Sequence, residues 1–153
     1  MRLAVLLALT LAAPALAQPV AVKDLDAAVV AVVTKAAPGI AITEAEHKPR
    51  DGRRYYDVEG RLPDGREIEF DLLLTPAGWQ VVEIQRDIAW AEAPAPVRAA
   101  TPTGALPVRV IESKQTDGSI VYELFAAGQP KDPAIEVMWK DGQAKVLTER
   151  WPH

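Results

Sequence analysis

The chain has 153 residues, no cysteine, two histidines and a formal net charge of −4. The lack of cysteine excludes disulfides, thiolate catalysis and cysteine-based zinc or iron–sulfur sites. A hydrophobic content of 49% with 25% charged residues is typical of a folded domain rather than a disordered chain. The acidic balance argues against nucleic acid as a partner, because neutralising phosphates requires an excess of Lys and Arg.

The first seventeen residues have the pattern of a secretory signal peptide. A positive start at Met1-Arg2 precedes an apolar stretch from Leu3 to Ala13, and Ala15-Leu16-Ala17 supplies small residues for cleavage after Ala17. The apolar stretch is shorter than the roughly 20 residues that span a bilayer, which disfavours an uncleaved anchor. We therefore expect export to the periplasm or secretion, with no stable membrane insertion after cleavage.

One helix and four strands are predicted between the signal peptide and residue 88. Apolar residues recur at helical spacing from Leu25 to Ala36, and Pro38-Gly39 ends this element. The paired valines of the segment are also compatible with a strand. Four strand patterns follow, separated by glycine-containing turns, at residues 40–48, 53–61, 66–75 and 79–86.

The second half of the chain repeats this pattern at an offset of 66 positions. Five residues of one window, Glu46, Lys48, Asp51, Gly52 and Tyr56, match Glu112, Lys114, Asp117, Gly118 and Tyr122. Duplication explains the match better than a coincidence of Asp-Gly turns. The strands predicted in this half are 106–114, 119–127, 134–140 and 143–150. Their inward residues are predicted to be Val108, Tyr122, Leu124, Ile135, Val137 and Val146.

We therefore predict an α+β fold of two tandem repeats, each a helix packed on an antiparallel β-meander of about four strands. The first repeat would span residues 18–88 and the second 89–153, with a Pro/Ala-rich linker at 89–96. The helix of the second repeat is weakly predicted, since only 97–100 lie between Pro96 and Pro102.

The region from Pro38-Gly39 to Ile84 resembles the PepSY and PepSY-like domain family. The matching features are Tyr56-Asp57-Val58, Gly65, the alternating strand 68–74 and Gly78-Trp79. A fainter second copy keeps Tyr122, Ile135-Glu136-Val137 and Asp141-Gly142. Two such units in tandem are also similar to the β-lactamase inhibitor protein architecture, although those inhibitors carry a disulfide in each repeat. The resemblance implies an exported, non-enzymatic binding protein that inhibits or regulates an envelope or extracellular protein such as a peptidase.

No catalytic, metal or cofactor site is predicted. A catalytic serine needs a partnering histidine, but His153 is terminal and His47 lies at the end of a strand among arginines. Histidine pairs with metal-ligand spacing and phosphate-binding glycine loops are absent from the sequence. We therefore expect neither enzymatic activity nor a bound cofactor.

A row of carboxylates is the candidate binding feature. Acidic residues alternate with apolar ones along two strands, so one sheet face should carry them. The predicted partner-binding residues are Tyr55, Asp57, Glu59, Glu67, Glu69, Asp71, Trp79 and Glu83. Residues 18–88 hold 13 acidic and 9 basic groups, so a protein partner with a basic surface would dock on this half. The alternatives are a merely solvated sheet face, calcium coordination or paired-acid chemistry on these carboxylates, and a small-ligand or cation site in a cleft between the repeats.

Overall fold

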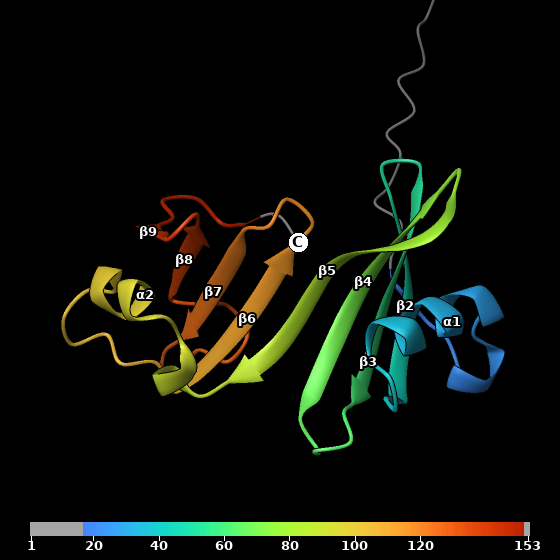
Figure 1. Cartoon of the computed structure of the whole chain (residues 1–153), viewed down its shortest axis with the longest axis horizontal. Helices are drawn as coiled ribbons and strands as arrows, with labels where there is room; N and C mark the ends of the chain where they lie inside the picture. The colour runs from blue at the N-terminus through green and yellow to red at the C-terminus, as the bar shows by residue number, and fades with distance from the viewer. Residues whose placement is uncertain (1–16, 152–153) are drawn as a thin grey trace, which may run out of the picture.

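The structure is a computed structural model that describes residues 17–151. The predicted signal peptide therefore lies, except for Ala17, outside the described residues. Figure 1 shows the chain as one sheet carrying a short helix near each end. Its elements are β1 (Gln18–Pro19), η1 (Val22–Asp24), α1 (Ala27–Ala36), β2 (Ala41–Arg50), β3 (Arg53–Arg61), β4 (Glu67–Thr75), β5 (Gly78–Ile88), η2 (Trp90–Glu92), α2 (Ala95–Ala100), β6 (Arg109–Gln115), β7 (Ile120–Phe125), β8 (Ile135–Lys140) and β9 (Gln143–Val146).

The nine strands form one continuous antiparallel sheet in chain order, β1 to β9. The predicted fold of two tandem repeats, each a helix packed on its own meander, is therefore wrong: of the described residues 47% are strand and 16% helix, and a single sheet runs through both halves. The halves are joined by the β5–β6 ladder, in which six residue pairs from Glu83↔Gln115 to Ile88↔Val110 connect them edge to edge. The local periodicity of a sequence indicates that a segment is a strand. It does not indicate which strand pairs with an exposed sheet edge, because that strand can lie far along the chain.

The individual strands agree closely with the sequence patterns, and the α1 prediction is confirmed. Asp26 is the N-cap of α1 and accepts a hydrogen bond of 2.8 Å from the Ala28 amide. The valines of α1 are helical because Val29 and Val33 are both fully buried against the sheet, which outweighs their weak helix propensity. Val108 is a failed prediction: it precedes β6 and is 69% exposed.

Both helices cover the same face of the sheet. Val33 of α1 packs in a cluster with Val58 and Phe70, and Val97 of α2 packs in a second cluster with Tyr122 and Val137. The strand register connects the two clusters, because Phe70↔Ile84 and Ile88↔Val110 place their side chains on one face. Within residues 17–151 the opposite face carries no helix, and we call it the helix-free face.

Among the residues that the structure describes, neither helix has the length and apolar character required to cross a membrane.

Candidate functional site

The helix-free face of β2–β5 carries a dense group of acidic side chains. Antiparallel partners project to the same face, and here acids stand opposite acids on successive strands. One row runs Glu46↔Asp57↔Asp71↔Glu83, and the next runs Glu44↔Glu59↔Glu69. We call these seven residues the acidic patch: Glu44, Glu46, Asp57, Glu59, Glu69, Asp71 and Glu83. Like charges directly opposite each other destabilise a sheet, so this arrangement requires local compensation.

Lys48 supplies part of that compensation. Its ammonium group forms an ion pair with Asp57, and the Asp57 side chain is 11% exposed. The patch is therefore not a uniformly solvated surface. Lys48 is itself 45% exposed, so its charge is partly available to solvent.

Glu83 is held by two donors from β6. The hydroxyl of Ser113 and the side-chain amide of Gln115 both donate to Glu83 Oε1, the amide at 2.9 Å. Glu83 is 6% exposed and Ser113 is fully buried. These hydrogen bonds satisfy a charge that would otherwise be costly to bury. They also cross from one half of the chain to the other, since the two donors follow the β5–β6 connection.

Asp71 lies between Asp57 and Glu83 at the centre of the first row. Among residues 17–151, its Oδ1 atom is buried without a hydrogen-bond partner. Burial, followed by the charges of Glu83 and Glu69, raises the pKa of Asp71 to about 7. Removing water favours the uncharged form, and the neighbouring negative charges act in the same direction.

Glu59 is the exposed counterpart of Asp71 in the second row. Partial burial raises its pKa, and the negative charges of Glu44, Glu67 and Glu46 act in the same direction. Glu44 and Glu46 were not among the predicted site residues. Their position on this face follows from the register of β2 against β3. That register depends on a bulge between Ile42 and Glu44, which the sequence of β2 alone does not reveal.

The remaining predicted residues occupy different environments. Glu67 lies on the helix-free face beside the patch, exposed and paired with Arg61. Tyr55 is on the same face with the Arg50 guanidinium 4.7 Å from its ring centre. Trp79 is 8% exposed and belongs to the core on the helix side. The structure therefore brings the predicted carboxylates and Tyr55 to one face, and places Trp79 on the other.

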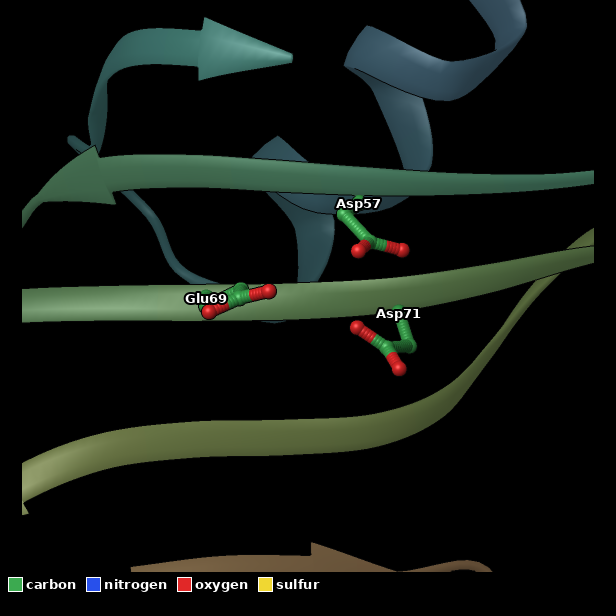
Figure 2. Close-up of side chains that lie close together, drawn as sticks. All are labelled: Asp57, Glu69 and Asp71. Carbon is green, nitrogen blue, oxygen red and sulfur yellow. The ribbon is translucent and has the colours of Figure 1, made fainter. Parts of the chain in front are cut away.

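Three carboxylates of the patch are close enough to surround one cation. Oxygens of Asp57, Glu69 and Asp71 lie within 4.8 Å of one another, and Figure 2 shows them on the two neighbouring strands β3 and β4. Oxygen donors are the ligands that Ca²⁺ and Mg²⁺ prefer. Because Lys48 already pairs with Asp57, we describe this group as a carboxylate cluster and assign no ion to it.

Comparison with protein-family models, curated proteins and solved structures found no match for this chain. The acidic patch must therefore be interpreted from its own chemistry.

A shallow pocket lies beside the patch and is lined by residues of β2 to β6, across the joint between the two halves. Its volume is about 140 Å³, and charged side chains of both signs, including Glu59, Arg61 and Arg109, line it. Sites for small organic ligands typically have volumes of about 300–1,000 Å³. The pocket is thus large enough for a side chain of a partner but small for a metabolite.

On the other half of the helix-free face Glu136 also stands opposite another acid, Glu123, and residues after β9 contact the Glu136 carboxylate. Glu136 of β8 is 5% exposed, and the Trp151 amide donates a 2.8 Å hydrogen bond to its Oε2. Arg150 lies 3.7 Å from the other carboxylate oxygen. The chain after β9 therefore returns over this half, whereas Lys48, which pairs with Asp57 of the acidic patch, comes from the sheet itself.

Proposed function

We propose that the protein is an exported, non-enzymatic binding protein whose acidic patch docks on a basic surface of another protein. Its role would be to inhibit or regulate that partner in the periplasm or outside the cell. The observation that carries the proposal is the alignment of seven carboxylates on four adjacent strands of a helix-free face.

The energetics of the patch favour docking over a purely structural role. Opposed carboxylates destabilise the sheet, and the buried Oδ1 atom of Asp71, which has no hydrogen-bond partner among the described residues, adds a desolvation cost. Lysine or arginine side chains of a partner would offset both, because a charge-assisted hydrogen bond is about twice as strong as a neutral one. Local sequence choices that oppose stability are expected at functional sites.

The surroundings of the patch also suit an interface. Tyr55 lies beside it and is partly exposed, and tyrosine is enriched among the residues that contribute most to binding. The signal-peptide pattern supports export, and the resemblance of residues 55–84 to PepSY-like proteins supports a binding rather than a catalytic role.

A matched pair of charge-reversal variants tests the proposal. Glu44→Lys/Glu59→Lys changes two exposed residues of the patch, whereas Asp132→Lys/Glu149→Lys makes the same charge change at exposed positions of the other half. The purified proteins are immobilised and exposed to an envelope extract, after circular dichroism has shown that both variants are folded. We expect a discrete partner to be captured by the native protein and the control variant and lost with the patch variant.

Salt provides a second criterion, since exposed charge contacts are screened over a Debye length of about 8 Å at physiological ionic strength. Capture should therefore weaken as salt is raised. Equal capture by the patch and control variants would contradict docking through the acidic patch.

A further inference from the structure

The centre of the acidic patch is a pair of carboxyl groups facing each other across two strands. Asp71 of β4 stands directly opposite Glu83 of β5. Asp71 Oδ1 is buried without a hydrogen-bond partner in the described part of the chain, and Glu83 is 6% exposed. Two carboxylates this close, with little access to water, cannot both ionise without a large cost.

The donors around Glu83 favour its ionised form. Ser113 and Gln115 of β6 both donate to Glu83 Oε1, and neither side chain titrates near neutral pH. Hydrogen bonds donated to a carboxylate stabilise the charge. Asp71 has no such pair of donors among the described residues, and its buried Oδ1 atom has no hydrogen-bond partner there. Of the two facing carboxyl groups, Asp71 is therefore the one that keeps a proton more readily.

The charges that face Asp71 from the other strands are mostly negative. Glu69 lies on its own strand, and β3 contributes Asp57 directly opposite. From β2, the positive charge of Lys48 acts on Asp71 in the opposite direction. Lys48 forms an ion pair with Asp57, next to Glu46. The helix side is separated from this cluster by the sheet itself. The balance around Asp71 therefore favours retention of a proton.

We propose that Asp71 and Glu83 share one proton at neutral pH, and that a basic partner displaces this proton when it docks on the acidic patch. This inference rests on the proposed docking function and adds its regulation. A partner cation within about 4–6 Å favours the ionised carboxylates and so releases the proton. Docking is then weak in acidic surroundings and strengthens as the pH rises.

Burial and the charges of Glu83 and Glu69 raise the pKa of Asp71 to about 7. The pH dependence of docking is therefore expected in the neutral range. For release of one proton with this midpoint, linkage gives an increase in affinity of about tenfold between pH 6 and pH 8. With a tenfold change in affinity, the protein would bind its partner weakly in an acidified environment and more tightly in a neutral one.

Whether Asp71 and Glu83 share a proton in the free protein is tested by carbon-13 NMR of the side-chain carboxyl groups. The protein is expressed with its own N-terminal segment, purified and titrated from pH 4 to pH 9. We expect the Asp71 signal to titrate near pH 7 and to move down by at least one pH unit in Glu83→Gln, which keeps the shape of the side chain. A midpoint for Asp71 below pH 5 in the native protein would overturn the shared proton.

The coupling is tested by calorimetry with a lysine decapeptide as the basic probe. Titrations in two buffers of different ionisation enthalpy report the protons released on binding. The native protein should release a proton at pH 6.5 and bind about tenfold more tightly at pH 8 than at pH 6. Asp71→Asn should lose both effects while still binding, and Asp132→Asn, the same change at an exposed position of the other half, should keep both.

The two proposals fail in different ways. If the probe binds with the same affinity at pH 6 and pH 8 and Asp71 titrates below pH 5, docking stands and the proton coupling is overturned. If Asp71 titrates near pH 7 and neither the probe nor any envelope protein binds, the docking function is overturned and the coupling with it.

Discussion

The side-chain amide of Gln115 on β6 donates a 2.9 Å hydrogen bond to Glu83 on β5. The same amide lies 2.8 Å from the hydroxyl of Ser113, which donates to the same carboxylate oxygen. This three-residue contact lies in the β5–β6 ladder, where the two halves of the sheet meet. It therefore links the stability of the joint between the halves to the charge state of the patch.

Replacing Ser113 by alanine should destabilise the protein by about 1–3 kcal/mol, the usual cost of removing one partner of a buried polar group. The reason is that Glu83 keeps its charge in a buried position with one donor fewer. Urea denaturation of the native protein and the variant measures the difference in the free energy of unfolding. In the Glu83→Gln background the same change should cost less, because the acceptor is then neutral. Equal costs in both backgrounds would mean that the Ser113–Glu83 contact does not carry the effect.

Gly60 on β3 should not tolerate a side chain. A Cβ atom at this position would lie 2.7 Å from Ile40 and 2.8 Å from the backbone oxygen of Ala41. We expect Gly60→Ala to cost about 1–3 kcal/mol, the typical range for overpacking, measured by thermal and urea unfolding. Adding Ile40→Ala should recover only part of this loss, since the Ala41 oxygen remains. A Gly60→Ala protein as stable as the native one would refute the close approach of β2 and β3 here.

Substitutions of Trp79 and Tyr55 should have different effects, the first on stability and the second on binding. Trp79 packs edge-on against Tyr56 with 5.0 Å between ring centres, and its indole nitrogen faces Asp26 at 3.5 Å. Trp79→Ala should therefore cost about 3–5 kcal/mol, as for other buried aromatics. Tyr55→Ala should leave the free energy of unfolding nearly unchanged and weaken capture of the partner. If Trp79→Ala weakened capture and Tyr55→Ala lowered stability, the assignment of Tyr55 to the interface and of Trp79 to the core would be contradicted.

Tyr122 should make the protein less stable in alkaline solution. Burial, followed by the charge of Glu112 and the 3.3 Å hydrogen bond to it, raises the pKa of Tyr122 to about 12, from an ordinary value of 10.0. The folded protein thus keeps a proton that the unfolded chain loses, so the free energy of unfolding falls as the pH rises above 10. Urea denaturation between pH 8 and pH 11 should show this fall in the native protein. Tyr122→Phe should reduce the slope, and an unchanged slope would assign the effect to other groups.

Several parts of the fold follow from local sequence patterns alone. The alternation of Phe70 and Leu72 with Glu69 and Asp71 predicts both the strand β4 and its two faces, because the side-chain period of a strand is two. The cap at Asp26 is equally local, since it depends on a side chain two residues from its donor. Glycine-containing turns then separate successive strands at the predicted places.

Other parts depend on contacts that no local pattern contains. The burial of Asp57 and Glu83 comes from partners on β2 and β6 rather than from their own strands. Trp79 begins a strand beside a turn, a position equally compatible with the core and with a partner surface. The continuous sheet depends on the β5–β6 pairing, including the bidentate contact between Asp87 and Arg109. These are relations between distant residues, which is why composition and periodicity did not predict them.

The strand order of the sheet also has a consequence for how the chain folds. Because every strand pairs with its immediate predecessor and successor, most ladders close by short turns and have a small entropic cost of loop closure. The exceptions are the β1–β2 ladder, whose strands are separated by residues 20–40 including α1, and the β5–β6 ladder, whose strands are separated by residues 89–108. Folding should therefore begin independently in each half and end when β5 meets β6, so that mutations in this ladder accelerate unfolding more than they slow folding. The joint between the halves would then set the kinetic lifetime of the native protein.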